Sequence, residues 1–292
     1  MKIKAFTIAI GTIVLGVIGF YHFSYVKKLE HNQQQQEFMS AIENGQQTKV
    51  LEFLNSKNIN LNQLIYGNLA LTLAAEKGDI KTINLLLQKG ANIDLPNAKG
   101  YNPLFIAIKN GNSSLIHFLL ENGKANPIFK IPSGWTPLHM LASIGKEADI
   151  KFLLNILKRI TKNIDFRDKY GITPLMYASV KGQAELIKLL LESGANPNAK
   201  SNTRMTPLLF LTSARTVNLK GALYLIKSGA QINLADQDGL TPLMAAAYRG
   251  HESLVALLTS KGADKNIKNN AGKTAAELAH SRGNRRIAAF LR

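Results

Sequence analysis

Apolar and polar residues alternate in a pattern that recurs along the chain from residue 37 onward. A short segment that contains alanine is followed by one in which leucine and isoleucine recur at the spacing of one helix face, as in Leu186, Ile187 and Leu190. Glycines lie at or near the segment ends, where a left-handed residue typically closes a helix. The pattern therefore predicts pairs of short helices joined by turns, and an all-α fold.

The helix pairs repeat with a period of about 33 residues. A turn glycine opens each copy, except that an arginine takes its place once, and successive copies lie 34, 37, 33, 35 and 33 residues apart. These positions are Gly100, Gly134, Gly171, Arg204, Gly239 and Gly272, and Gly67 opens an earlier copy. Self-similarity at a fixed period of this length predicts a solenoid, in which each repeat contacts only its neighbours.

Most copies carry Thr-Pro-Leu after the turn, as in Thr136, Pro137 and Leu138, which His139 follows. Threonine suits the position that caps a helix, and proline suits the first helical turn, where its missing N–H costs nothing. Repeats of this length with this motif resemble the ankyrin repeat. The resemblance covers residues 37–292 and implies an ankyrin-repeat solenoid with short β-hairpin-like turns, about six full repeats and terminal caps. It also implies that His139 forms hydrogen bonds around Thr136 and braces the turn.

Three copies depart from the pattern. The copy at Gly134 runs to 37 residues and lacks a closing Gly-Ala, which predicts a longer second helix or loop. The copy at Gly67 has Leu69-Ala70-Leu71 in place of Thr-Pro-Leu, so we expect a less well defined first turn. The copy at Arg204 lacks the glycine in the middle of the repeat, and we expect a bulge within residues 212–218.

The start of the chain has a different pattern. Residues from Ala5 to Phe23 form an apolar run without formal charge, with two lysines on either side, and as a helix this run would span about 28 Å. Residues 1–28 are therefore predicted to be an N-terminal transmembrane anchor, and residues 29–36 a polar linker. A cleaved signal peptide is the alternative, although no small-residue cleavage site follows the run. The flanking charges slightly favour a cytoplasmic N terminus, which would place the repeats on the non-cytoplasmic side.

The chain is strongly basic, with 36 Lys and Arg against 19 Asp and Glu in 292 residues and a net charge of +17. Much of this surplus lies at the two ends. Residues 1–28 hold four lysines and no acid, and residues 265–292 hold seven Lys or Arg against Glu277 alone. Because the repeats between them carry a small excess and no nucleic-acid module is visible, nucleic acid is disfavoured as a partner.

The residue types that carry chemistry are sparse. The chain has no cysteine, which excludes disulfides and thiolate metal sites, and no two of its six histidines have the i, i+4 spacing of a metal-binding helix. Phosphate-binding glycine loops and nucleophile elbows are also missing. We therefore expect no enzymatic activity, cofactor, metal site or small-molecule substrate.

Binding is expected at positions that the repeat pattern leaves free, which in the ankyrin family are the turn tips and the exposed face of each first helix. On this chain these are Lys77, Lys99, Tyr101, Lys109, Trp135, Lys169, Tyr170, Lys181, Gln237, Tyr248 and Arg249, with Tyr66, Asn68, Glu76, Ser133 and Asp238 beside them. The set mixes cations with aromatic rings, as protein interfaces do. Trp135, the only tryptophan, either anchors a partner or packs across its hairpin.

These observations predict a membrane-tethered, non-enzymatic module that binds a protein partner through the groove and turn tips of its solenoid. The alternative is a secreted effector with a cleaved export signal, whose repeats bind a host or neighbouring-cell protein.

Overall fold

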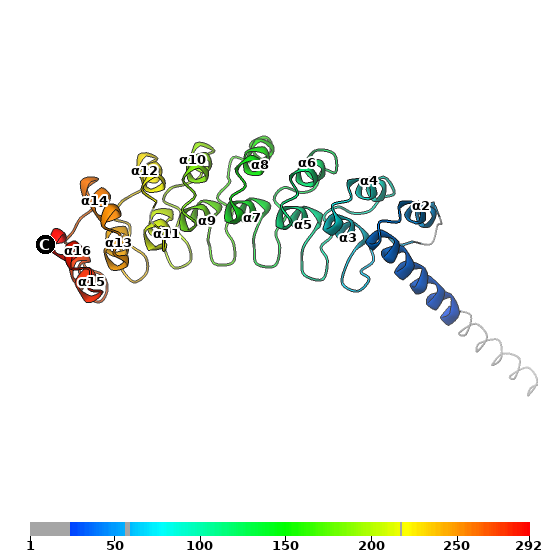
Figure 1. The fold of residues 1–292 in the computed structure, drawn as a ribbon, viewed down its shortest axis with the longest axis horizontal. Helices are drawn as coiled ribbons and strands as arrows, with labels where there is room; N and C mark the ends of the chain where they lie inside the picture. Colours follow the sequence, from blue (N-terminus) through cyan, green and yellow to red (C-terminus); the bar gives the residue numbers. More distant parts are fainter. Residues whose placement is uncertain (1–23, 56–58, 217) are drawn as a thin grey trace, which may run out of the picture. The chain divides into compact units, whose positions relative to one another are not determined.

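The computed structural model describes residues 24–55, 59–216 and 218–292, and it is built from helix pairs, as the pattern predicts. Figure 1 shows that within each pair a first helix is followed by a second helix. The turns lie on the side of the first helices that faces away from the second helices. The first helices are α3 (Ala70–Lys77), α5 (Pro103–Lys109), α7 (Pro137–Ile144), α9 (Pro174–Val180), α11 (Pro207–Ser213), α13 (Pro242–Arg249) and α15 (Ala275–Ser281). The second helices are α4 (Ile80–Gln88), α6 (Ser113–Glu121), α8 (Glu147–Ile160), α10 (Ala184–Glu192), α12 (Leu219–Lys227), α14 (Glu252–Ser260) and α16 (Arg285–Leu291).

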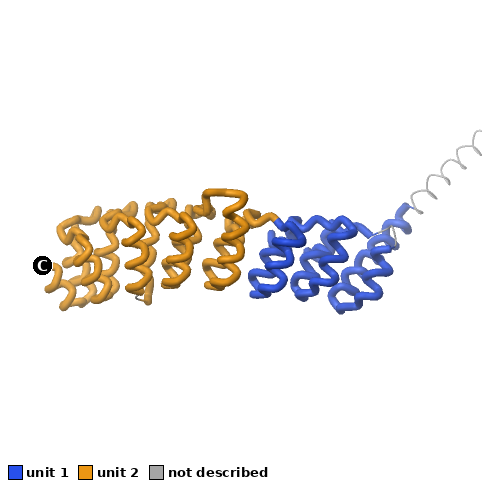
Figure 2. Tube along the Cα trace, turned by 90° about the horizontal axis from the view of Figure 1, so that it is seen from above, with its two compact units in different colours: residues 1–125 blue, residues 126–292 orange. Residues whose placement is uncertain are grey.

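The chain divides into two compact units, residues 1–125 and 126–292 (Figure 2). In the first unit α3 packs against α4 and α5, and α5 packs against α6. In the second unit the first helices form a series in which α7 contacts α9, α9 contacts α11, α11 contacts α13 and α13 contacts α15. Within each unit, a first helix therefore contacts its own second helix and the neighbouring first helix of the same unit.

The threonines of the motif explain where the first helices begin. The Thr241 side chain accepts a hydrogen bond from the Met244 N–H at 3.3 Å, and Pro242 occupies the first helical position. Thr173, Thr206 and Thr274 cap α9, α11 and α15 in the same way. In the copy without the motif, Leu69 lacks such a side chain, and the Thr72 hydroxyl accepts a hydrogen bond from the Leu69 N–H at 2.8 Å instead. The first turn of α3 is therefore ordered, contrary to our expectation, because a threonine three residues later replaces the cap.

Small residues line the faces along which the first helices pack. Ala74, Ala107, Ala178, Ala246 and Ala279 share one position of the repeat, and each is completely inaccessible to solvent. The same position holds Leu141 and Leu211 in the other two copies, which are equally buried. Alanine lets two helix backbones approach closely. Within each unit the buried core therefore runs along the contacts between consecutive first helices.

The predicted departures have structural counterparts. Helix α8 has 14 residues, whereas α10, α12 and α14 have nine each, which confirms the longer second helix in the copy at Gly134. In the copy at Arg204, helix α11 ends at Ser213 and is followed by Ala214, whose backbone is extended, rather than by a left-handed glycine. The bulge expected within residues 212–218 includes residue 217, which lies outside the described residues, and stays a prediction.

A helix over residues 24–43 precedes α2 (Gln47–Asn55) at the start of the first unit. Phe38 and Phe53 pack edge to face across the two helices, with ring centroids 5.9 Å apart. Residues 29–36, which we predicted as a polar linker, are helical, consistent with the good helix propensity of glutamine. The predicted membrane segment, Ala5–Phe23, lies outside the described residues. Among the helices that the structure describes, none is long and apolar enough to cross a bilayer.

The turn of the Arg204 copy provides a test of backbone strain. Arg204 has φ +64°, in the left-handed region that the turn glycines occupy in the other copies. A side chain there costs about 1–2 kcal/mol, and glycine's greater unfolded-state entropy offsets part of the gain. We expect Arg204→Gly to raise the free energy of unfolding by about 1 kcal/mol, measured by urea denaturation of the full chain in detergent.

Gly272→Ala is the matched control, because Gly272 has φ +72° and no atom lies within 4 Å of an added Cβ. This change should lower the free energy of unfolding by about 1 kcal/mol. A lowered stability of Arg204→Gly would contradict the strain at this turn.

Candidate binding surface of the turns and first helices

The turns of the second unit are linked to one another by backbone hydrogen bonds. The Lys169 N–H donates to the Ser133 carbonyl at 3.1 Å, and the Asn202 N–H donates to the Tyr170 carbonyl at 2.9 Å. Equivalent bonds continue through the next two turns. Pro132 holds the donor position in the turn before them and, as a proline, has no N–H to donate. We call the surface formed by these turns and the last turns of the first helices in residues 126–292 the tip surface.

A buried aspartate holds the turn that contains Tyr170. One Asp168 oxygen accepts hydrogen bonds from the Tyr170 and Ile172 N–H groups, both at 2.8 Å, and the other accepts one from the Tyr177 hydroxyl at 2.8 Å. Burial and the neighbouring Asp168 carboxylate raise the pKa of Tyr177, so its hydroxyl remains a donor. The turn is therefore rigid before any partner arrives.

Trp135 extends from its own turn and packs against Tyr177 of helix α9, in the next repeat. Their rings meet edge to face with centroids 4.8 Å apart, and the indole Nε1–H donates to the Tyr177 hydroxyl at 3.0 Å. Trp135 is half-buried, so one part of the ring is held by Tyr177 and another part faces solvent. Trp135 therefore packs across to the next repeat, and its role as an anchor for a partner stays a prediction.

Tyr177 and Asp168 were not among the predicted site residues. Tyr177 occupies a position where the other copies have apolar residues, so it resembles a core residue in the sequence. Asp168 looks like an ordinary turn acid. The hydroxyl of a tyrosine at that otherwise apolar position, nine residues after an aspartate, was the signal that pointed to this cluster.

His139 forms the hydrogen bonds that the family resemblance implies. Its Nδ1 accepts from the Thr136 N–H at 3.1 Å, so Nε2 carries the proton and donates to the Ile172 carbonyl of the next repeat at 3.0 Å. The ring is completely inaccessible to solvent. This burial lowers the pKa of His139 to about 4, and the ring is neutral at pH 7. His251 also joins repeats, through a 2.8 Å contact between its Nε2 and the Ala214 carbonyl.

The predicted cations of the tip surface are exposed. The Lys169 ammonium lies 4.9 Å from the centroid of the Tyr170 ring, and Tyr170 is 59% exposed. Lys181 ends helix α9, and Arg249 lies in the last turn of α13 beside Tyr248. Gln237 is exposed in its turn.

Arg282, at the end of α15, was not predicted. Its guanidinium lies 4.4 Å from the centroid of the Tyr248 ring. A partner for Tyr248 from the next repeat could not be recognised from spacing within one repeat.

The predicted residues of the first unit form a smaller group. Tyr101 is half-buried and stacks on Phe105, with ring centroids 6.3 Å apart, and the Lys109 ammonium lies 5.7 Å from the Tyr101 ring. Lys77 and Lys99 are exposed, in the last turn of α3 and in a turn. A first-helix lysine and a turn tyrosine therefore lie on one face of the repeat.

The buried and half-buried polar groups of the tip surface serve the scaffold. Asp168, His139 and Tyr177 use their polar atoms on turn N–H groups, carbonyls and one another. No group of three or more His, Asp or Glu side chains within the described ranges is placed to hold a metal ion. The groups that remain available to a ligand include exposed cations and aromatic rings, which suit binding.

Comparison with known proteins identifies the repeats. A family model described as ankyrin repeats matches the chain three times, over residues 38–130, 124–201 and 209–292. Protein glp-1 of Caenorhabditis elegans is 30% identical over 237 residues, covering 77% of this chain and 18% of that protein. Transient receptor potential cation channel subfamily A member 1 of Homo sapiens is 26% identical over 280 residues, covering 71% of this chain and 25% of the channel subunit. The chain thus spans a quarter or less of the length of these relatives.

The buried His139 makes a prediction about pH. In the unfolded chain the imidazole has its ordinary pKa of 6.5, and in the folded protein its pKa is about 4. Between these values the unfolded state binds more protons, so stability falls as the pH is lowered from 6.5 to 4. The loss attributable to His139 should reach about 3 kcal/mol near pH 4, measured as urea unfolding of the full chain in zwitterionic detergent.

His139→Met is the control, since Met176 and Met244 occupy the same position in other repeats. This variant should be less stable at pH 7, having lost two hydrogen bonds, but should show a correspondingly shallower decline between pH 6.5 and 4. An unchanged decline would contradict the low pKa of His139.

Proposed function

We propose that this chain, which belongs to the ankyrin repeat family, is a non-enzymatic module that binds a protein partner through the tip surface. Ankyrin repeats are typically protein-interaction modules, and all three family matches lie within this chain. The observation that carries the proposal is that buried and exposed side chains of the turns have different roles. Buried polar groups such as Asp168 hold the turns, and the exposed groups between them include cations and aromatic rings.

The aromatic residues of the tip surface suit the role of anchors. Tyr170 is 59% exposed and Tyr248 38% exposed, and each ring is held by a cation beside it. Trp135 is fixed by Tyr177 and keeps part of its ring in solvent. Rigid aromatic side chains lose little entropy on binding, so partly exposed rings on ordered turns favour association.

We further propose that the module is tethered to a membrane through Ala5–Phe23, with the repeats on the non-cytoplasmic side. The apolar run has the length of a bilayer core, and no small-residue cleavage site follows it. The tether would hold the tip surface near the membrane and raise its effective concentration toward partners there.

Substitution of two exposed rings tests the binding surface. Tyr170→Ser with Tyr248→Ser should lower capture of the partner by the membrane-anchored full chain at least about tenfold, because each substitution removes a ring that anchors the partner. Proximity labelling and pull-down with quantitative mass spectrometry measure the capture. Phe290→Ser is the control, since Phe290 is 54% exposed on α16 and lies outside the tip surface. Equal capture by all three proteins would reject this surface.

Fractionation and N-terminal sequencing test the tether. The full chain should sediment with membranes, resist extraction by alkaline carbonate and begin at Met1 or Lys2, because an uncleaved apolar helix remains in the bilayer. Protease added to intact cells or vesicles of known orientation should digest the repeats on the non-cytoplasmic side. A soluble product that begins after Phe23 would instead establish the secreted alternative.

A further inference from the structure

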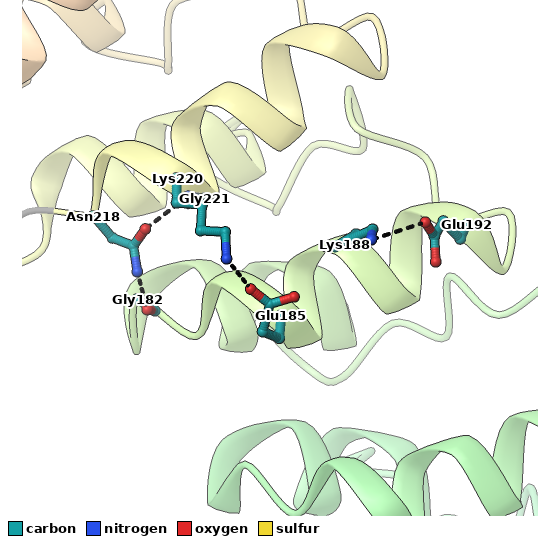
Figure 3. Close-up of polar contacts among 7 residues, drawn as sticks. All are labelled: Gly182, Glu185, Lys188, Glu192, Asn218, Lys220 and Gly221. Carbon is teal, nitrogen blue, oxygen red and sulfur yellow. Dashed lines mark hydrogen bonds and ion pairs between the residues drawn. The ribbon is translucent and has the colours of Figure 1, made fainter.

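Some charged residues of the second helices form ion pairs with one another. Lys188 and Glu192 lie 3.7 Å apart within α10, and Lys220 of α12 contacts Glu185 of α10 (Figure 3). Lys151 and Glu147 form the same kind of pair within α8, at 2.6 Å. Three lysines of these helices are therefore paired with carboxylates, whereas the exposed Lys158 and Lys227 form no ion pair within the described residues.

The cations of the tip surface have no such neutralisation. These cations are Lys169, Lys181, Arg204, Arg249, Lys273 and Arg282, all of which are exposed. In the part of the chain that the structure describes, none of them forms an ion pair with a carboxylate. An array of unpaired cations on one surface creates a positive potential that attracts and orients an anionic partner.

Most of the carboxylates in the same segments hold the turns through hydrogen bonds, and they keep their negative charge. Asp168 accepts from two backbone N–H groups and a hydroxyl, and Asp236 accepts from the Asp238 and Leu240 N–H groups at 2.9 Å each. Glu277 accepts from the Thr274 N–H at 2.7 Å and caps α15. Among these acids, Asp238 alone is both exposed and without a role in holding its own turn.

Aromatic rings hold two of the cations without removing their charge. Lys169 lies over Tyr170 and Arg282 over Tyr248, with cation to centroid distances of 4.9 and 4.4 Å. A ring orients a cation through its quadrupole and leaves the full positive charge available to a ligand. The two sites are therefore partly pre-organised for an anion, which reduces the entropy lost on binding.

The spacing of the repeats identifies the kind of anion. Packed helices lie about 8–10 Å apart, so each repeat presents its cations at roughly that interval along the surface. An extended peptide advances about 3.3 Å per residue, and carboxylates three residues apart match this interval. We propose that the tip surface binds an extended acidic segment of a partner protein, with a carboxylate at about every third residue.

Nucleic acid fits this surface less well. Duplex DNA presents one phosphate charge per about 1.7 Å of its axis, a far denser array than one group of cations per repeat. The proposal rests on the proposed function, since it names the chemistry of the partner that the same surface receives.

A synthetic peptide tests the proposal directly. The full chain is placed in nanodiscs of zwitterionic phosphatidylcholine, and the probe is a labelled peptide of about 15 residues with glutamate at every third position among glycine and serine. Its binding is followed by fluorescence anisotropy at physiological ionic strength, where surface charges more than about 8 Å apart are largely screened. We expect saturable binding that weakens with added salt. A peptide of identical composition with its glutamates contiguous should bind at least about fivefold more weakly.

Charge reversal locates the site. Lys169→Glu, Lys181→Glu and Arg249→Glu together should weaken binding of the spaced peptide at least about tenfold, because three attractions become repulsions. The matched control is Lys158→Glu, Lys227→Glu and Lys261→Glu, which makes the same change in net charge on exposed lysines of the second helices or at their ends. This control should stay within about twofold of the unchanged protein. Equal losses in the two triple variants would overturn the proposal.

Two further arms separate the possible failures. Tighter binding of a single-stranded oligonucleotide than of the spaced peptide would overturn the proposal in favour of nucleic acid. If Tyr170→Ser with Tyr248→Ser abolishes partner capture but neither peptide binds, the acidic class is wrong and the proposed function stands. If the substitutions leave capture unchanged and neither peptide binds, both are wrong.

Discussion

The close packing of one first helix on the next is the constraint on which the rest of the structure depends. Where Ala178 or Ala246 meets the neighbouring helix, the side chain is fully buried and small enough for the backbones to approach. Two copies carry leucine at this position. In α11 the next residue is Thr212, whose hydroxyl donates a hydrogen bond to the Leu209 carbonyl of its own helix at 3.2 Å. The second helices and the turns project from this series of first helices. No repeat can bury its apolar face alone, so each repeat is stable only beside its neighbours.

The turns are held by polar groups that a buried position makes obligatory. His139 is neutral and joins its own turn to the Ile172 carbonyl of the next repeat, while Asp168 collects two N–H groups and the Tyr177 hydroxyl. Unpaired polar atoms at such positions would cost free energy, so each of these side chains is committed to a defined set of partners. The same commitment directs most carboxylates of the turns toward backbone N–H groups, while the cations there are exposed. Electrostatic character on the tip surface is thus a consequence of how the scaffold satisfies its own backbone.

Charge distribution within the second unit has a similar origin. The second helices place acids and lysines at i, i+4 positions or across neighbouring helices, as in Lys188 with Glu192, where opposite charges come together. The last turns of the first helices instead favour cations near helix C termini, where the macrodipole stabilises positive charge, as with Arg249. Three lysines of the second helices are therefore paired with carboxylates, whereas the tip surface presents unpaired cations beside aromatic rings. The net charge of the whole chain does not reveal this difference between the two sides.

The sequence by itself determined the repeat architecture, because period, capping threonines and helix-closing glycines are local signals that each copy repeats. The length of the 37-residue copy also predicted a longer second helix or loop, and the resemblance to the ankyrin repeat implied the hydrogen bonds of His139 around Thr136. Only the tertiary structure decided which side chains meet across repeats. Tyr177 looks like a core residue in the sequence, yet it joins Trp135 to Asp168, and Arg282 covers a ring from the preceding repeat. These contacts depend on the stacking of neighbouring repeats, which brings residues more than thirty positions apart to within hydrogen-bond distance. No pattern within a single repeat predicts which of these residues meet.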